Sequence, residues 1–433
     1  MVLAPFVLSI LSLQQSQAAA AAARPLFEPE IRVLHEFVGE SAGGQFGWIG
    51  RNAGDCDGDG VNDVLLSAPT HSGPCPASGR IYVYSGKSGK LLLQADGKAG
   101  DQLGIGIERA FDVDGDGFYD VIAGAPGAEG GKGAARVYSG KTGALLRTLV
   151  GEAPGDNFGR KVGSPGDANG DGYSDLLVGA DNCDSVGRDA GRAYLYSGKD
   201  GALLLALDGE EEGDKFGVSL CGQVIGGSTW LLIGAADAGG AKGGRAYVFE
   251  WKGSEPELVY TIDADATGVA LGAMFVSFVG DVDADGFPDV YVSDWQNNAR
   301  GNSTGRVYVH SGRSGKRLLE LTGERAGDGF GIGTADVGDV DGDGHADLLI
   351  GAWQSAAAAP SGGKCYLYSG KDGALLDAWV CTLANETFGF DTTGMGDVDG
   401  DGAIDYLITN AWSGIRGAQS GRAFLLAGAR RKR

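Results

Sequence analysis

The sequence lacks any apolar run of the ~20 residues that a membrane-spanning helix needs. The apolar stretch from Val2 to Leu13 is shorter, and small residues follow it from Ala18 to Ala23. This pattern predicts an export signal over residues 1–23 and no membrane span. A disordered Ala-rich leader is the alternative, since no Lys or Arg precedes the apolar stretch. We expect a protein that is secreted, or retained at the cell surface or in the periplasm.

Basic residues are also scarce. The chain has 35 Lys and Arg against 57 Asp and Glu, a net charge of −22, which argues against nucleic-acid partners. Histidine occurs only four times, and no nucleophile motif such as GxSxG lies nearby. We therefore predict no catalytic residues. The carboxylate pairs of glycosidases stay open as an alternative, because acidic residues are abundant.

Proline is sparse at 12 residues, while glycine reaches 79 of 433 and apolar residues make up 43%. A collagen-like chain would hold much more proline, and a disordered chain would be less apolar. The glycines therefore indicate many turns in a chain that can bury a sizeable core.

Six cysteines are present, an even number that allows disulfides in an oxidising compartment. Short sequence separations make Cys56–Cys75 and Cys365–Cys381 plausible pairs, whereas CxxC metal or redox spacing is absent. Buried free thiols are the alternative.

An acidic motif of nine residues recurs through the chain. It reads DCDGDGVND, DVDGDGFYD, DANGDGYSD, DVDADGFPD, DVDGDGHAD and DVDGDGAID, and begins at Asp55, Asp112, Asp167, Asp281, Asp339 and Asp397. The starts lie 55 to 58 residues apart, except for one gap of 114 that equals two periods. A seventh unit is therefore expected near residue 225, where CGQVIGGSTWLLIGAAD keeps the flanking pattern but has lost the acids.

The flanks of the motif repeat as well. A Phe-Gly or Leu-Gly pair precedes it by nine residues, as at Phe46, while the fifth unit sets Leu271 one residue further back. A buried-type strand such as LLIGA, an alternating strand such as RIYVY, an SGKxG turn and a final apolar strand follow. Each unit is thus four short strands, and seven units predict an all-β, seven-bladed β-propeller over residues 24–429.

The chain ends favour a closed ring over a stacked solenoid. Residues Ile31 to Val38 match the final strand of a unit, while the last unit stops after its third strand. The N-terminal strand is therefore expected to complete the seventh blade, which removes the exposed edge of an open array.

The motif has the spacing of a Ca²⁺ loop. Carboxylates at positions 1, 3 and 5 fall on one side of a tight turn, Gly at position 6 permits the bend, and position 7 offers its carbonyl. The predicted ligands, with the Asp at position 9, are Asp55, Asp57, Asp59, Val61 and Asp63; Asp112, Asp114, Asp116, Phe118 and Asp120; Asp167, Asn169, Asp171, Tyr173 and Asp175; Asp281, Asp283, Asp285, Phe287 and Asp289; Asp339, Asp341, Asp343, His345 and Asp347; and Asp397, Asp399, Asp401, Ala403 and Asp405.

About six structural Ca²⁺ ions are expected from these loops. The alternative, acidic hairpins without a metal, would leave four carboxylates repelling one another within nine residues. Asn169 replaces one carboxylate, so the third loop is expected to bind more weakly.

The Phe-Gly pair, the DxDxDG loop and the Gly-Ala-Pro at 124–126 resemble the FG-GAP repeat family, best known from the propeller of integrin α chains. The resemblance covers residues 31 to 428 and implies structural Ca²⁺ in blade hairpins. Nothing in the sequence resembles an inserted adhesion domain, a leg region or a transmembrane helix. The resemblance therefore implies the propeller module of the family but not an integrin-like receptor role.

Strand counting separates two faces of the propeller. Antiparallel strands place the Ca²⁺ loops and SGKxG turns on one face and the longer connectors on the other, where binding usually occurs. Trp295, Trp353 and Trp412 lie at or next to the GAP proline position and could present aromatics near the connectors to a protein or glycan ligand. The alternative is that these rings are packed between blades.

These features predict an exported, Ca²⁺-binding module for recognition or adhesion, acting as a monomer on an extracellular protein or glycan. The alternative is an extracellular carbohydrate-active enzyme, a polysaccharide lyase or hydrolase, on the same scaffold. A quinone-holding redox propeller is disfavoured, because aligned tryptophans occur in only three units. The terminal RRKR, residues 430–433, is expected to be a solvated basic tail.

Overall fold

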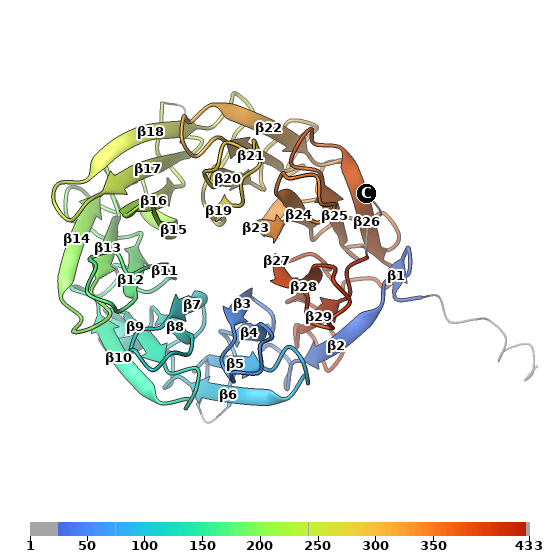
Figure 1. Cartoon of the computed structure of the whole chain (residues 1–433), viewed down its shortest axis with the longest axis horizontal. Coiled ribbons are helices and arrows are strands. Elements are labelled where there is room, and N and C mark those ends of the chain that lie inside the picture. Colours follow the sequence, from blue (N-terminus) through green and yellow to red (C-terminus); the bar gives the residue numbers. More distant parts are fainter. Residues whose placement is uncertain (1–24, 74, 241, 430–433) are drawn as a thin grey trace, which may run out of the picture.

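A computed structural model describes residues 25–73, 75–240 and 242–429, so the predicted export signal and basic tail lie outside the described residues. Seven separate antiparallel sheets stand around a central axis like the blades of a propeller (Figure 1). The all-β, seven-bladed prediction is confirmed. The one helical segment among the described residues, α2 (Ala128–Gly131), is four residues long and includes two residues with positive φ.

In each blade the strands run in order from the axis to the rim. Blade 1 contains β3 (Gly50–Gly54), β4 (Asp63–Ala68), β5 (Arg80–Tyr84) and β6 (Leu91–Asp96). Blade 2 contains β7 (Ile107–Phe111), β8 (Asp120–Ala125), β9 (Ala134–Tyr138) and β10 (Leu145–Val150). Blade 3 contains β11 (Lys161–Gly166), β12 (Asp175–Ala180), β13 (Arg192–Tyr196) and β14 (Leu203–Asp208). Blade 4 contains β15 (Phe216–Ile225), β16 (Ser228–Ala235), β17 (Arg245–Trp251) and β18 (Glu257–Asp263).

The remaining blades follow the same order. Blade 5 contains β19 (Val276–Val279), β20 (Asp289–Asp294), β21 (Arg306–His310) and β22 (Arg317–Thr322). Blade 6 contains β23 (Phe330–Gly338), β24 (Asp347–Ala352), β25 (Lys364–Tyr368), β26 (Leu375–Cys381) and β1 (Phe27–Glu28). Blade 7 contains β27 (Thr392–Gly396), β28 (Asp405–Asn410), β29 (Arg422–Leu426) and β2 (Val33–Val38).

The N-terminal strand closes the ring as predicted. Strand β2 pairs antiparallel with β29, the last strand of the described chain, so the two share blade 7, and β2 begins at Val33 rather than Ile31. Before it, β1 adds a fifth strand to blade 6, which the sequence did not predict. The cause is Phe27, which is buried against Phe388 and Phe424 with ring centroids 4.6 and 5.1 Å apart.

The second strand of each blade is the core strand. All residues of β4, β8, β12, β20, β24 and β28 are buried, because blades pack against both of their faces. Their near-continuous apolar sequences fit burial on two sides. By contrast, the rim strands expose leucines such as Leu91 and Leu145.

The Phe-Gly pairs join neighbouring blades. Phe158 forms a parallel bridge with Gly133 of the preceding blade, and Phe388 does the same with Gly363. A Cβ on Gly363 would lie 2.1 Å from the carbonyl oxygen of Phe388, and the residue has φ +90°, so only glycine fits. Leu271 bridges Gly244, so the shifted pair in the fifth unit occupies the same place.

Blade 4 is the degenerate unit expected near residue 225. Its first two strands are ten and eight residues long and are joined by Gly226 and Gly227, both with positive φ. A two-residue hairpin of this kind suits the twist of antiparallel strands. The tight hairpin therefore replaces the acidic loop of the other six units.

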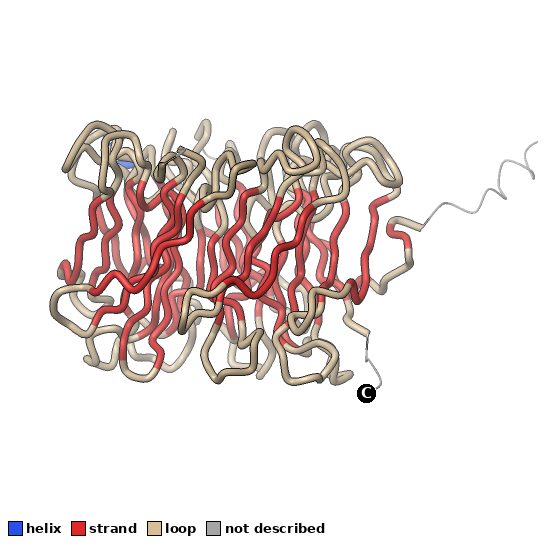
Figure 2. Tube along the Cα trace, turned by 90° about the horizontal axis from the view of Figure 1, so that it is seen from above, coloured by secondary structure: helices blue, strands red, loops and turns tan. Residues whose placement is uncertain are grey.

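The two faces of the propeller differ as predicted. The acidic loops and the SGKxG turns lie on one face, which we call the loop face. The longer links between second and third strands, and between blades, lie on the other, which we call the connector face (Figure 2).

Neither of the two plausible cysteine pairs forms a disulfide. All six cysteines are free, and Cys56, Cys183, Cys365 and Cys381 are buried, so the alternative of buried thiols holds for these four. Within the described residues, no helix is long and apolar enough to cross a membrane.

Candidate metal centres and the connector face

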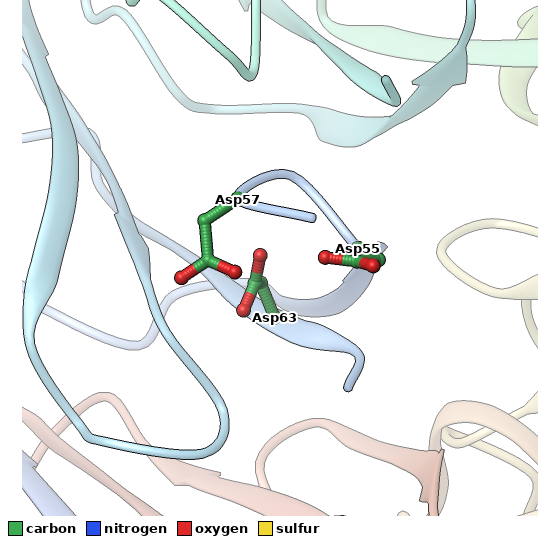
Figure 3. A group of neighbouring side chains, drawn as sticks. All are labelled: Asp55, Asp57 and Asp63. Atoms are coloured by element: carbon green, nitrogen blue, oxygen red, sulfur yellow. The ribbon is translucent and has the colours of Figure 1, made fainter. Parts of the chain in front are cut away.

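Each acidic loop connects the axial strand of a blade to its core strand and gathers carboxylates at the tip. In blade 1, Asp55 and Asp57 point toward Asp63 (Figure 3), and one oxygen from each of the three lies within 4.8 Å of the others. A Ca²⁺ ion sits about 2.3–2.6 Å from its oxygen ligands, so two ligands of one ion lie up to about 5 Å apart. The geometry of these oxygens fits a single Ca²⁺ ion.

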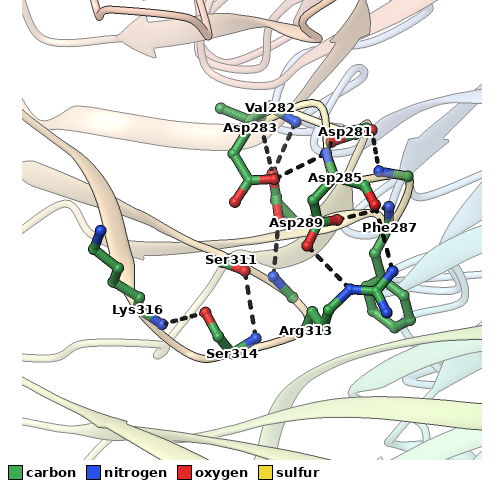
Figure 4. Close-up of polar contacts among 12 residues, drawn as sticks. Asp281, Val282, Asp283, Asp285, Phe287, Asp289, Ser311, Arg313, Ser314 and Lys316 are labelled. Carbon is green, nitrogen blue, oxygen red and sulfur yellow. Dashed lines mark hydrogen bonds and ion pairs between the residues drawn. The ribbon is translucent and has the colours of Figure 1, made fainter.

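The loop backbone orients these carboxylates. The Asp55 Oδ1 atom accepts hydrogen bonds from the backbone N–H groups of Gly58 (2.7 Å) and Asp59 (3.1 Å), and its Oδ2 from that of Gly60 (2.9 Å). The Asp59 Oδ1 atom accepts a hydrogen bond from the N–H of Val61 at 3.0 Å. Blade 5 has closely similar contacts (Figure 4). Backbone N–H groups of the loop thus fix the orientation of its carboxylates.

The aspartate at position 9 anchors the loop to the rest of the blade. Asp63 is fully buried, accepts a hydrogen bond from the N–H of Cys56 at 2.7 Å and another from the N–H of Gly86, in the SGKxG turn, at 3.0 Å. Burial raises the pKa of Asp63 to about 6 and that of Asp120 to about 7, although hydrogen bonds from backbone N–H groups act to lower both values. Neighbouring loop carboxylates raise both pKa values further.

Five loops bring three carboxylates together. The groups are Asp55, Asp57 and Asp63; Asp112, Asp114 and Asp120; Asp281, Asp283 and Asp285; Asp339, Asp341 and Asp347; and Asp397, Asp399 and Asp405. The third loop is not among them, because Asn169 replaces a carboxylate; its amide donates to Asp171 at 3.3 Å. These oxygen-only donor sets suit a hard cation such as Ca²⁺, and the third loop offers less charge.

The residues predicted to offer a carbonyl at position 7 have a further role. Their backbone N–H groups donate to the position 5 carboxylate, as His345 does to Asp343 at 3.0 Å. The His345 side chain reaches the neighbouring loop, with Nδ1 2.7 Å from the carbonyl oxygen of Val282. His345 thus connects two adjacent loops, while metal ligation by the position 7 carbonyls stays a prediction.

The predicted tryptophans do come together. The ring centroids of Trp295 and Trp353 are 6.3 Å apart, and those of Trp353 and Trp412 are 6.1 Å apart. Phe390 extends the group from Trp353 (5.4 Å) to Trp48 (5.2 Å). We call these five residues the aromatic cluster. The sequence analysis missed Trp48 and Phe390, although Trp48 directly follows the first Phe-Gly pair.

The aromatic cluster is neither fully packed nor fully exposed. All four tryptophans are partly exposed, and they follow or precede strand ends on the connector face. The indole nitrogens of Trp353 and Trp412 are buried and have no hydrogen-bond partner among the described residues. A buried N–H without a partner is costly, since indole normally finds one.

The axial strands line a central cavity of about 410 Å³. At its wall, Arg51 pairs with the buried Asp391 at 2.5 Å and with Glu108 at 2.9 Å. Lys161 also lines the cavity, where burial and then the charge of Arg51 lower its pKa to about 8. The channel therefore holds mixed charge and ties blades 1, 2 and 7 together.

Comparison with known proteins agrees with the repeat pattern. The FG-GAP repeat model matches residues 110–138 and 158–196, and the FG-GAP-like repeat model matches residues 281–350. This chain carries FG-GAP repeats. The matched segments include acidic loops and core strands of blades 2, 3, 5 and 6.

Relatives among characterised proteins include integrin α chains. Integrin alpha-5 of Xenopus laevis is 32% identical over 187 residues, 39% of this chain and 18% of the relative. Integrin alpha-PS5 of Drosophila melanogaster is 31% identical over 181 residues, covering 38% and 17%. Integrin alpha-V of Gallus gallus is 28% identical over 284 residues, covering 63% and 22%. The match thus spans about a fifth of each relative's length, and the FG-GAP chain resembles the integrin α propeller.

Proposed function

We propose that this FG-GAP protein is an exported, Ca²⁺-stabilised module for recognition or adhesion, which binds an extracellular protein or glycan through its connector face. The observation that carries the proposal is the partly exposed aromatic cluster on that face. Aromatic rings with polar N–H groups suit both stacking on sugars and anchoring a protein partner. The resemblance to integrin α chains supports a recognition or adhesion module.

Calcium has a structural role in this proposal. The six acidic loops hold 23 of the 57 acidic residues, four in each loop except the third, which holds three. Outside the loops the acidic and basic residues nearly balance. Ca²⁺ at the loops would neutralise the concentrated charge and hold the first two strands of each loaded blade in register. The connector face would then stand on a rigid scaffold.

The boundaries of the mature protein follow from the same proposal. Removal of residues 1–23 would leave the propeller over residues 24–429 and the basic tail over 430–433, outside the cell as a monomer. Strand β1 fits this view, because Phe27 docks into blade 6 only a few residues after the proposed cleavage site.

A binding array tests the function. Residues 24–433 are applied to glycans and matrix proteins with Ca²⁺ and with EDTA. We expect binding without turnover. This binding should be lost when Trp295, Trp353 and Trp412 are all changed to Ala. Trp230→Ala is the matched control, since Trp230 is also partly exposed but contacts Phe287 of an acidic loop, 4.9 Å away.

The outcomes separate the alternatives. Unchanged binding by the triple variant, in a protein that keeps its circular dichroism spectrum, would remove the aromatic cluster from the account. Release of oligosaccharide products from an arrayed polysaccharide would instead favour the carbohydrate-active enzyme.

A further inference from the structure

A basic side chain faces the acidic loop in four blades. It is the third residue of the SGKxG turn or its SGRxG equivalent, and it contacts the aspartate at position 5 of the loop in the same blade. The pairs are Lys87 with Asp59 (3.7 Å), Lys141 with Asp116 (3.5 Å), Arg313 with Asp285 (3.1 Å) and Lys371 with Asp343 (3.4 Å). Figure 4 shows Arg313 reaching Asp285 from the turn. We call these four residues the turn cations.

Blade 7 obtains its cation from elsewhere. Its third strand ends the described propeller, so there is no SGKxG turn before a fourth strand. Arg32, which directly precedes the closing strand β2, forms an ion pair with Asp399 of the acidic loop instead. A basic group thus reaches the loop even where the chain connectivity differs.

The two blades without this ion pair in the described chain, blades 3 and 4, have a less charged acidic loop or none. In blade 3, where Asn169 lowers the loop charge, Lys199 lies over the Tyr173 ring at 5.0 Å, and no ion pair with a loop carboxylate is found among the described residues. In blade 4, which has no acidic loop, the corresponding Lys252 pairs with Glu250 of its own strand at 2.9 Å. The cation therefore engages the loop in the five blades whose loops keep all four carboxylates.

The contact engages the aspartate that the loop spacing predicts as the position 5 ligand, and in blade 5 this residue, Asp285, belongs to the group of three converging carboxylates. In blade 1 the Oδ1 atom of Asp59 accepts the N–H of Val61, while its Oδ2 faces the Lys87 ammonium. In blade 5 the Asp285 Oδ1 is held by the N–H of Phe287, and its Oδ2 by Arg313. A cation on the loop stabilises the metal-free carboxylates and repels an arriving Ca²⁺ ion.

We propose that the turn cations are built-in counter-ions that stabilise the metal-free loops and lower their Ca²⁺ affinity. The inference rests on the proposed Ca²⁺ binding. The turn cations are 45% to 60% exposed, so each acts as a surface ion pair of modest strength. Their removal should tighten Ca²⁺ binding by about two- to fivefold per site, the range that exposed pairs reach.

The test is a Ca²⁺ titration against a chelator of known affinity. The test variant changes Lys87, Lys141, Arg313 and Lys371 to Met. The control changes the exposed Lys90, Lys98, Lys132 and Lys316 to Met, which removes the same charge from side chains that contact no carboxylate in the described residues. We expect tighter binding by the test variant alone, together with a lower Tm of its metal-free form.

A second pair of variants works within one turn. Lys87→Met and Lys90→Met remove the same charge three residues apart, yet only Lys87 contacts Asp59. Equal affinities for the test and control variants, or weaker binding by the test variants, would overturn the inference while Ca²⁺ binding itself stood. A wild-type protein that binds no Ca²⁺ in the titration would remove both the inference and the proposed metal sites.

Discussion

Removing Ca²⁺ should lower the melting temperature of this propeller by a predictable amount. At free Ca²⁺ 100 times Kd, each site that exists only in the folded state contributes about 2.7 kcal/mol. The five loops that gather three carboxylates then contribute about 13 kcal/mol together. Unfolding entropy of about 2.1 cal/mol/K per residue gives about 0.9 kcal/mol/K for a chain of this length, so we expect Tm to fall by about 15 °C.

Differential scanning calorimetry in Ca²⁺ and in EDTA at neutral pH measures this fall. Asp341→Asn, which removes a loop carboxylate of blade 6, should reduce the difference between the two conditions by about 3 °C, one fifth of the total. Asp372→Asn is the control, because it removes the same charge from the neighbouring turn, where Asp372 accepts the N–H of Ala374 and has no ion pair within the described residues. Coincident melting curves in Ca²⁺ and EDTA would refute the reasoning.

Two further predictions concern the backbone and pH. Ala284 has φ +59°, a left-handed conformation that is strained for alanine, where the first loop has Gly58 at +78°. Ala284→Gly should therefore stabilise the protein by about 0.5–1 kcal/mol, measured by urea unfolding with saturating Ca²⁺. A loss of stability would contradict this backbone strain. Burial would raise the pKa of Asp265, but hydrogen bonds from Thr267, Tyr308 and Arg306 outweigh it and hold that pKa below its usual range. Ionised Asp265 therefore stabilises the fold above its unfolded pKa of about 3.9, and this stabilisation is lost as pH falls through its folded pKa. In acid unfolding, the difference in stability between wild type and Asp265→Asn should narrow below about pH 4. A constant difference would contradict the role of Asp265.

The repeat made most of this fold predictable from sequence. The acidic loops, the Phe-Gly pairs and the core strands each recur in register, and each is a local pattern whose geometry needs only a few consecutive residues. Even the degenerate blade 4 kept its period, so its unit was placed correctly near residue 225, where Gly226 and Gly227 join two strands.

What the sequence did not reveal depends on contacts between distant residues. Strand β1 has only two residues and no counterpart in the repeat, and it is held through Phe27 by side chains more than 350 positions away. The aromatic cluster joins Trp48 of blade 1 to Phe390 of blade 7, which become neighbours only when the ring closes. The pairing of the turn cations with the loops could have been found in the sequence, because the spacing recurs: Lys87 and Arg313 each lie 28 residues after the aspartate they contact.

The two faces of the propeller solve different physical problems. On the loop face the same nine-residue motif recurs with the same hydrogen bonds, and its buried aspartates tie each loop to the turn beside it. Blade 4 makes the same strand connection with two glycines and no acids, so the acidic loop is not needed merely to reverse the chain. Its retention in six blades therefore points to a demand beyond chain reversal, which Ca²⁺-dependent rigidity would meet. Because the loops that would supply that rigidity lie on the opposite side of the ring, the connector face is free to vary in length and composition.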